Sequence, residues 1–357
     1  MRYRIAAIPG DGVGMEVIPH AIEALRAAGE VTDRFSIEIT DLPWSCAYYL
    51  RHGRMMPSDG LEQLRDHDAI LLGAIGYPGV DDSISLWGLL LPIRQAFDQY
   101  VNLRPIRSYA GIPSPLRAID GTELDILCVR ENTEGEYVGA GGRHGKTPGA
   151  VALQTSIFTW RGTERVSRYA FDRARERGRR LASATKSNAL QYSAVLWDEV
   201  VAAVSADYPD VAVTSYHVDA LAARFVLDPL SLDVVVASNL FGDILTDLGA
   251  ALQGSLGLAA SGNLNPERLY PSMFEPVHGS APRRAGQGTA NPMAAVSAAA
   301  MMLRHLGESD AAALVDDAIA AIARSGPRTR DIGGKDGTAE VGVAIASHVR
   351  SKTPAGG

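Results

Sequence analysis

A buried strand that runs directly into a helix, residues 234–249 (VVVASNLFGDILTDLG), most constrains the fold of this chain. Its first four residues are apolar without alternation, which is typical of a parallel strand covered on both faces. Leu240, Ile244, Leu245 and Leu248 then recur at helical spacing. A parallel strand followed at once by a helix predicts an α/β fold.

Two acidic residues, Asp243 and Asp247, lie four apart on this helix and therefore share one face. They follow the carboxyl end of a strand, where parallel sheets bind their ligands. Carboxylate oxygens suit Mg²⁺ or Mn²⁺. In isolation, such a pair more often stabilises the helix dipole and faces water, so other motifs must decide.

Further strands of this type are predicted at 4–8, 35–39, 68–74, 124–129, 181–185 and 211–216, with helices at 15–28, 163–178, 191–205 and 289–306. Arg130, Lys186 and Asp219 come just after three of these strands, so we expect them at one edge of the sheet. Residues 86–101 have loose helical spacing, and Arg94 and Arg104 interrupt this apolar stretch. Such arginines either solvate a surface or hold carboxylates.

The chain carries 34 basic and 41 acidic residues, a net charge of −7, which argues against a nucleic-acid surface. An anionic ligand must then be held by a local basic cluster. Two cysteines and no signal-peptide pattern predict a reduced, cytoplasmic protein without disulfides. The longest run of small apolar residues, 293–303, is too short to span a membrane.

The turn after the first strand contains Gly10, Gly12 and Gly14, a G-x-G-x-G spacing. It differs from the dinucleotide fingerprint G-x-G-x-x-G and lacks the acidic residue at the usual distance, so a standard Rossmann site is not predicted. A nucleotide contact and a simple tight turn both stay open. Residues 139–149 read as a glycine-rich loop, and 150–158 alternate like an exposed strand or hairpin that a partner subunit would cover.

Several motifs together resemble the β-decarboxylating dehydrogenases, the family of isopropylmalate, isocitrate, homoisocitrate and tartrate/D-malate dehydrogenases. They occur in family order and cover almost the whole chain. The matching segments are IPGDGVG (8–14), Arg94 with NLRP (102–105), VRENTEGEY (129–137), TKSN (185–188), HVDA (217–220), SNLFGDILTDLG (238–249), EPVHGSAP (275–282) and GTANP (288–292).

The resemblance implies a two-domain α/β fold of the isopropylmalate/isocitrate dehydrogenase type, which is not a Rossmann fold. Residues 1–100 and 255–357 would form a discontinuous cofactor-binding domain. Residues 101–254 would form an inserted dimerisation domain, with an arm at about 137–159. The active sites would be shared between the two subunits of a homodimer.

The resemblance also implies the roles of individual residues. Asp219, Asp243 and Asp247 would bind Mg²⁺ or Mn²⁺, and Tyr137 and Lys186 would be the catalytic acid–base groups. Besides Tyr137, Lys186 and Asp219, the substrate would contact Ser85, Arg94, Arg104 and Arg130. NAD⁺ or NADP⁺ would contact Asn188, Glu275, His278, Gly279, Ser280, Ala281, Arg283, Asn291 and Asp331. Lys186 and Asp219 would reach the site from the partner subunit.

Within the family, residues 44–57 and 85–94 are most similar to the tartrate dehydrogenase/D-malate dehydrogenase branch. The expected reaction is oxidation and β-decarboxylation of a 2-hydroxy dicarboxylate. NAD-using relatives have an aspartate after the GSAP segment, whereas Arg283 and Arg284 follow it here. Guanidinium groups suit a 2′-phosphate, so the sequence leans slightly to NADP⁺. Alternatives are a 3-isopropylmalate dehydrogenase of leucine biosynthesis and a non-catalytic regulatory paralogue.

Overall fold

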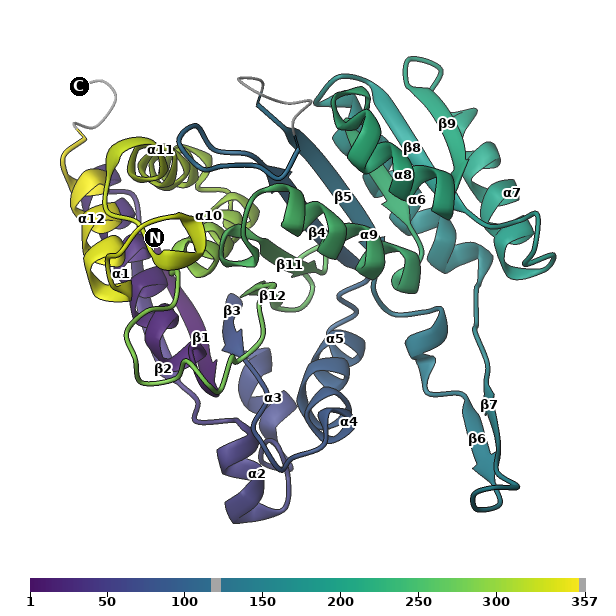
Figure 1. The fold of residues 1–357 in the computed structure, drawn as a ribbon, viewed down its shortest axis with the longest axis horizontal. Coiled ribbons are helices and arrows are strands. Elements are labelled where there is room, and N and C mark those ends of the chain that lie inside the picture. Colours follow the sequence, from purple (N-terminus) through teal and green to yellow (C-terminus); the bar gives the residue numbers. More distant parts are fainter. Residues whose placement is uncertain (117–122, 353–357) are drawn as a thin grey trace.

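The computed structural model describes residues 1–116 and 123–352 and is built around one twisted sheet (Figure 1). Ten strands of the described chain form this sheet, in the order β2 (Ser36–Asp41), β1 (Arg2–Gly10), β3 (Ala69–Ala74), β12 (Ser272–Pro276), β11 (Ala260–Leu264), β4 (Val101–Arg107), β5 (Asp125–Glu131), β10 (Val234–Ala237), β8 (Arg180–Thr185) and β9 (Ala212–His217). Both ends of the sheet are parallel, while β12, β11, β4 and β5 pair antiparallel in the middle. The antiparallel centre confirms an α/β fold that is not a Rossmann fold.

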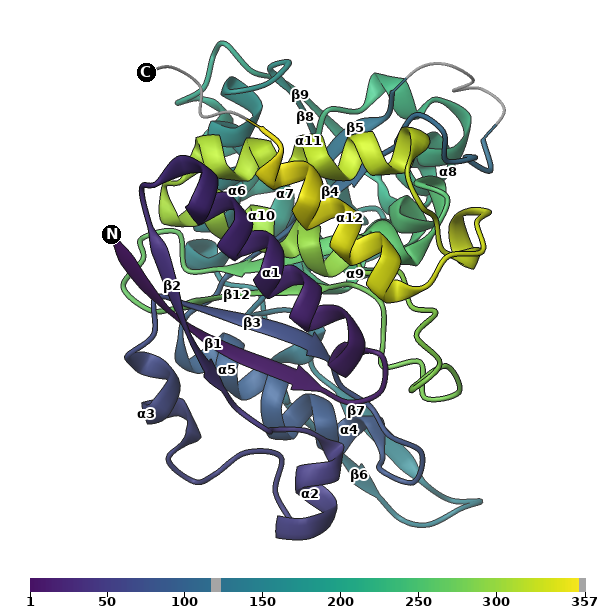
Figure 2. The same cartoon turned by 90° about the vertical axis from the view of Figure 1, so that its left-hand side faces the viewer.

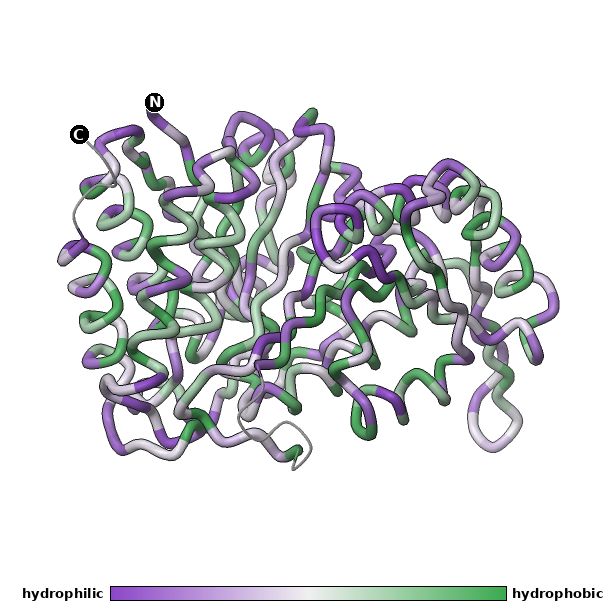
Figure 3. The backbone as a smooth tube through the Cα atoms, turned by 90° about the horizontal axis from the view of Figure 1, so that it is seen from above, coloured by the Kyte–Doolittle hydropathy of each residue, from purple (hydrophilic) through white to green (hydrophobic). Residues whose placement is uncertain are grey.

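Four helices cover one face of the β1–β3–β12 end of the sheet, namely α1 (Gly14–Thr32), α10 (Met293–Leu306), α11 (Ser309–Ser325) and α12 (Thr338–Arg350) (Figure 2). Helix α10 is buried along almost its whole length, because its alanines let neighbouring elements approach closely. Colouring by hydropathy shows hydrophobic and hydrophilic residues alternating along the helices of this layer (Figure 3). The helices therefore direct their apolar stripes toward the sheet.

The other face of this end packs against α2 (Cys46–His52), α3 (Gly60–Arg65), α4 (Asp82–Ser85), a π-helical turn η1 (Leu86–Leu90) and α5 (Leu91–Ala96). The predicted helical stretch 86–101 is wrong at its end. The helix stops at Ala96, Asp98 takes a left-handed conformation, and Val101 already begins strand β4. Arg94 therefore lies on a helix and Arg104 on a strand.

The β5–β9 end of the sheet is also covered on both faces. Val234 and Val236 pack in one core cluster with α6 (Trp160–Arg175) and α7 (Ser193–Ser205). Val235 and Ala237 point the opposite way and pack with α8 (Val218–Leu227) and α9 (Asn239–Leu252). The described chain also contains four short 3₁₀ helices, η3 (Glu136–Val138), η4 (Pro229–Ser231), η5 (Leu256–Leu258) and η6 (Arg330–Ile332).

A two-stranded hairpin, β6 (Gly141–His144) and β7 (Val151–Gln154), projects away from the body of the molecule (Figure 1). This confirms the exposed hairpin predicted near residues 150–158. Its apolar side chains are open to solvent in a single chain, with Val151 59% and Leu153 70% exposed.

The strands of residues 1–100 and 255–357 form one half of the sheet, and those of residues 101–254 form the other. The halves meet where β11 pairs with β4. The division into two domains stays a prediction. In the part of the chain that the structure describes, no helix is long and apolar enough to cross a membrane. Cys46 and Cys128 are both buried and free.

Candidate active site

Two arginines and two aspartates come together where β4, β5 and α9 meet. Arg130 Nη1 lies 2.6 Å from Asp243 Oδ1, and Arg104 bridges Asp243 and Asp247 at 3.3 Å to each carboxylate. Gly242 allows the approach, since a Cβ there would lie 2.5 Å from Arg130 Cγ. Three separate stretches of sequence thus contribute to one cluster.

Both arginines of this cluster are buried, and they differ in how far their N–H groups are hydrogen-bonded. Arg130 is 3% exposed and donates from Nε and Nη2 to Asn239 Oδ1, at 3.1 and 2.7 Å. Arg104 is 8% exposed, donates to Thr246 Oγ1 at 2.7 Å, and has no partner for Nε in the described chain. Burial, and then the charge of Arg104, lowers the pKa of Arg130, although a guanidinium stays charged near neutral pH.

Asn239 and Thr246, which orient these arginines, were not among the residues predicted from the sequence. The helical spacing of these residues could have identified them. Asn239 lies four residues before Asp243 and Thr246 three residues after it, so all three share a helix face.

Tyr137 joins the cluster from η3, just after β5. Its hydroxyl donates to Asp243 Oδ2 at 3.4 Å, and Arg130 Cζ lies 5.7 Å from the ring centroid. Burial, followed by the charge of Asp243, raises the pKa of Tyr137. The phenol is therefore protonated near neutral pH and able to donate a proton.

Arg94 and Ser85 belong to the segment that runs from α4 to α5. Arg94 is 8% exposed, pairs with Glu275 Oε1 at 3.0 Å, and has no partner for Nε in the described chain. Its charge contributes to the lowered pKa of Arg130, which places it in the same electrostatic neighbourhood. Ser85 is buried, and its hydroxyl donates to the Asp82 carbonyl at 2.9 Å.

Lys186 and Asp219 form a separate pair at the ends of β8 and β9. Lys186 Nζ lies 2.9 Å from Asp219 Oδ1, and this hydrogen bond lowers the pKa of Asp219. In the described chain neither side chain hydrogen-bonds to Asp243 or Asp247. Asn188 lies exposed in the turn after Lys186. One chain thus brings together only part of the predicted site.

A cavity of about 570 Å³ opens beside Asp247, which lines it. Five of the predicted cofactor residues line it too, namely His278, Gly279, Ala281, Asn291 and Asp331. The volume is within the usual range for pockets that bind small molecules and cofactors. The carboxylate cluster and the predicted cofactor site are therefore adjacent.

The glycine-rich turn after β1 supports one wall of this cavity. A Cβ on Gly12 would lie 2.0 Å from the Ser280 carbonyl oxygen, and the Val13 amide donates to that oxygen at 2.8 Å. A glycine is therefore needed for close approach to the loop that begins at Glu275. This close approach supports the interpretation of the glycine-rich segment as a tight turn. Val13, in the same turn, lines the cavity.

The lining of this cavity includes only part of the predicted cofactor set. Four of its members do not line the cavity, Asn188, Glu275, Ser280 and Arg283, whereas Arg284 does. Asp331 accepts hydrogen bonds from Asn291, Ser255 and Thr329, so it fixes the position of Asn291. His278 Nε2 is buried without a hydrogen-bond partner in the described chain, which suits a ligand donor or acceptor.

The predicted metal site is incomplete within one chain. Asp243 and Asp247 offer two carboxylates, and the described residues hold no cluster of three or more His, Cys, Asp or Glu side chains that could bind a metal ion. Their oxygens are the hard donors that Mg²⁺ and Mn²⁺ prefer, but six ligands are typical. The donor set is compatible with such an ion if substrate, water or a second chain supplies the remaining oxygens.

The fold places a cluster of buried arginines and carboxylates beside a cavity large enough for a small molecule or cofactor. A family model of isocitrate/isopropylmalate dehydrogenase matches residues 4–345. The chain therefore belongs to the isocitrate/isopropylmalate dehydrogenase family.

Within this family, the chain is similar to several named proteins. The chain is 54% identical over 311 residues to D-malate dehydrogenase [decarboxylating] of Escherichia coli (strain K12), covering 86% of each chain. It is 49% identical over 326 residues to a probable tartrate dehydrogenase/decarboxylase of Bacillus subtilis (strain 168), covering 91% of this chain and 92% of the relative. The crystal structure of isocitrate dehydrogenase from Methylococcus capsulatus superposes with a TM-score of 0.87 at 33% identity, covering 98% and 100%.

Proposed function

We propose that this protein oxidises and β-decarboxylates a 2-hydroxy dicarboxylate, D-malate or tartrate, using NAD(P)⁺ and Mg²⁺ or Mn²⁺. The observation that carries the proposal is the pairing of Arg104 and Arg130 with Asp243 and Asp247, beside the 570 Å³ cavity that Asp247 lines. Relatives named tartrate dehydrogenase/decarboxylase and D-malate dehydrogenase support the substrate class.

The arginines account for a substrate with two carboxylates. Arg94 and Arg104 each keep a buried Nε–H without a partner among the described residues, and Arg130 supplies a third guanidinium. Buried guanidinium groups bind carboxylates through paired, charge-assisted hydrogen bonds. Such contacts would fix the substrate's C2–H toward the cavity and hold its reacting groups in one orientation.

The acid–base groups are Tyr137 and Lys186. Lys186, in its unprotonated form, would take the proton of the C2 hydroxyl. Tyr137 keeps its phenolic proton near neutral pH and contacts Asp243, so it would return a proton to the carbon that has lost CO₂. Asp243, Asp247 and Asp219 would hold the divalent ion, which when bound polarises the C2 oxygen and stabilises negative charge there. Residues that line the cavity, such as His278, Gly279 and Asn291, would hold NAD(P)⁺, which when bound would supply the hydride acceptor.

A second copy of the chain is proposed to complete each site, as a homodimer. Apolar side chains on the helices that carry Asp219 and Asp243 are exposed in one chain, with Leu227 77% and Ile244 57% accessible. The exposed residues of the β6–β7 hairpin add to this surface. Their burial between copies would bring the Lys186–Asp219 pair of one chain to Asp243 of the other.

The indole of Trp87 distinguishes between the candidate substrates. It is 43% exposed, and a Cβ on Gly139 would lie 2.7 Å from its Cη2, so the ring packs over that glycine. A bulky indole beside the substrate segment leaves less room for a branched alkyl group than for a hydroxyl or hydrogen. This favours tartrate or D-malate over 3-isopropylmalate. We also propose a cytoplasmic location, since a reducing compartment suits two free buried cysteines.

A crossed assay tests the function directly. Purified protein is given D-malate, L- or meso-tartrate, 3-isopropylmalate or isocitrate, each with Mn²⁺ and either NAD⁺ or NADP⁺, while reduced cofactor is recorded. We expect turnover of D-malate or tartrate that a chelator abolishes. Dominant turnover of 3-isopropylmalate would show that the role given to Trp87 is wrong. Ligand binding without any turnover would favour a regulatory paralogue.

Cofactor preference should follow the two arginines after Pro282. Arg284 lines the cavity and Arg283 is its exposed neighbour, so together they offer positive charge to a 2′-phosphate. We propose a preference for NADP⁺ on this basis. Arg283→Asp should lower the ratio of kcat/KM for NADP⁺ over NAD⁺ by about 10-fold or more, since one charge-assisted hydrogen bond contributes about 1.5–3 kcal/mol.

The same ratio for Arg284→Gln shows which arginine acts more strongly. Arg54→Asp is the matched control, because Arg54 is exposed and has no ion pair or side-chain hydrogen bond in the described chain. An unchanged ratio in both cofactor-loop variants would contradict a phosphate role for the pair.

A further inference from the structure

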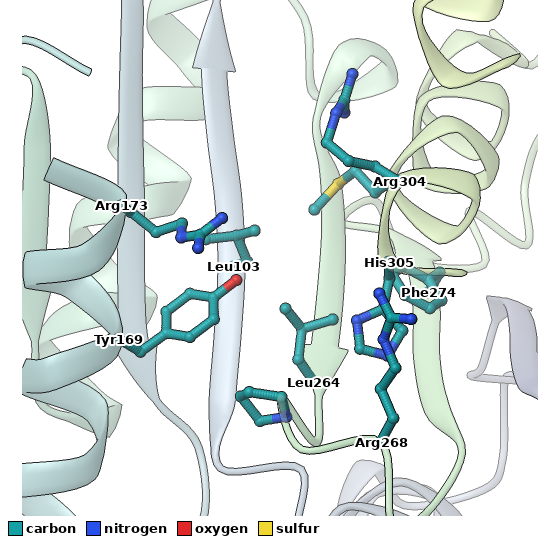
Figure 4. A pocket seen from close by; sticks show the side chains of 10 residues that line it. Leu103, Tyr169, Arg173, Leu264, Arg268, Phe274, Arg304 and His305 are labelled. Atoms are coloured by element: carbon teal, nitrogen blue, oxygen red, sulfur yellow. The ribbon is translucent and has the colours of Figure 1, made fainter. Parts of the chain in front are cut away.

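A second cavity of about 220 Å³ lies between α6 and α10 (Figure 4). Its floor is apolar and includes Leu103, Leu264 and Phe274. Three arginines surround it, Arg173 from α6, Arg268 from the β11–β12 connection and Arg304 from α10. Cationic groups around an apolar floor are a combination that the proposed reaction does not use.

This cavity and the candidate active site lie on opposite faces of the sheet. Leu103 lines the cavity, whereas its neighbour Arg104 reaches Asp243 and Asp247. Because successive strand residues point to opposite faces, a ligand at Leu103 cannot belong to the Arg104 cluster. The cavity also lies between the two halves of the molecule, since α6 packs on one half of the sheet and α10 on the other.

The charges around the cavity are only partly balanced. Arg173 pairs with Glu176 and Arg304 with Asp316, each at 2.7 Å, but Arg268 has no ion pair in the described chain. Arg173 Nε is buried without a hydrogen-bond partner there, and the Tyr169 hydroxyl at the edge of the cavity donates to no described group. The nearby acid Glu267 accepts from the Tyr100 hydroxyl at 2.7 Å.

We propose that this cavity binds a small organic anion, a carboxylate or phosphate group attached to an apolar body. The anionic group would lie among Arg268, Arg173 and Arg304, where charge-assisted hydrogen bonds are available. The apolar body would cover Leu103, Leu264 and Phe274. A volume of about 220 Å³ suits a ligand much smaller than a dinucleotide. This inference does not depend on the proposed reaction.

Calorimetric titration of the full-length protein tests the site with four probes. Phenyl phosphate and benzoate carry the two anionic groups on the same ring, benzyl alcohol is their neutral counterpart, and inorganic phosphate lacks the apolar body. We expect phenyl phosphate or benzoate to bind at least about 10-fold more tightly than the last two, with weaker binding at high salt. The better of the two anions identifies the preferred group.

Arg268→Gln should weaken that binding at least about 10-fold, because of the three arginines around the cavity it removes the one that has no acidic partner in the described chain. Arg54→Gln is the matched control and should leave binding unchanged. Thermal unfolding and the basal dehydrogenase rate of Arg268→Gln establish that the variant is folded. Arg173→Gln is a second variant, which removes the i,i+3 pair with Glu176 and the contact of the guanidinium with the Tyr169 ring, 5.2 Å from Cζ to the ring centroid.

Three results would overturn the proposal. Binding that survives both substitutions would place the anions elsewhere, for example on the active-site arginines. Equal affinity for inorganic phosphate and phenyl phosphate would mean nonspecific attraction of anions. No detectable binding of either aromatic anion would leave the cavity without a ligand of this class.

Discussion

We expect co-expression of Lys186→Ala and Asp243→Asn chains to restore dehydrogenase activity that each variant alone lacks. Each variant by itself should lose activity about 1,000-fold, because it lacks either the proposed base or a metal ligand. Random pairing makes half of the dimers mixed. If sites are shared, each mixed dimer has one intact site, so the preparation should show about a quarter of the wild-type activity.

The expectation follows from the separation of two clusters in one chain. Lys186 contacts Asp219 at 2.9 Å, whereas Asp243 contacts Arg130, Arg104 and Tyr137. A twofold axis would place the Lys186–Asp219 pair of each chain beside Asp243 of the other. Both substitutions in a mixed dimer then fall in the same site, and the other site keeps all its groups.

The control mixes Lys186→Ala with Asp219→Asn. These two residues belong to one cluster of one chain, so every site in a mixed dimer carries one defect and no activity should return. Differently tagged chains and native mass spectrometry establish that mixed dimers form. A shared site is excluded if mixed dimers of the first pair stay inactive, or if a monomer at high dilution is active.

The strand and helix of residues 234–249 could be predicted because their apolar pattern matches their burial. Strand β10 occupies the predicted apolar run, and α9 begins at Asn239 and presents Asp243 and Asp247 on one face. The hairpin at β6–β7 was also predictable, since its alternation is not obscured by packing. In these segments local sequence and final environment agree.

Three of the central strands, β4, β11 and β12, were not predicted, because their burial depends on polar contacts from distant segments. Asn102 on β4 is fully buried and donates to Ser261 and Asn263 on β11, at 2.7 and 2.9 Å. Such polar residues do not give the apolar pattern of a buried strand. The left-handed turn at Asp98, which separates α5 from β4, leaves no mark in the apolar spacing either.

In the cofactor loop, the sequence likewise does not predict which of two adjacent side chains faces the cavity. The sequence identified the two adjacent arginines Arg283 and Arg284, and of these Arg284 lines the cavity. Which side chain faces inward depends on the loop backbone, including a positive φ at Ala281. An alanine gives little indication of that conformation, since only glycine and a few polar residues commonly favour it.

Replacing Arg130 with lysine keeps the positive charge but removes the planar group that organises the cluster. Arg130 Nε and Nη2 both bind Asn239 Oδ1 while Nη1 binds Asp243, a pattern that one ammonium group cannot reproduce. We expect Arg130→Lys to lower kcat/KM about 100-fold, corresponding to about 3 kcal/mol for lost charged hydrogen bonds. Steady-state kinetics with the best substrate of the crossed assay measures this loss.

Arg165→Lys is the control that separates catalysis from folding. Arg165 also binds a carboxylate with two contacts, both oxygens of Asp98 at 2.8 Å, and its Cζ lies 4.1 Å from the Tyr100 ring. It has no contact with the Asp243 cluster among the described residues, so Arg165→Lys should lower Tm and leave kcat/KM unchanged. If Arg130→Lys behaves in the same way, its role is to stabilise the fold. A loss of kcat/KM beyond any loss of folded protein, seen only for Arg130→Lys, is the result that a substrate-binding arginine requires.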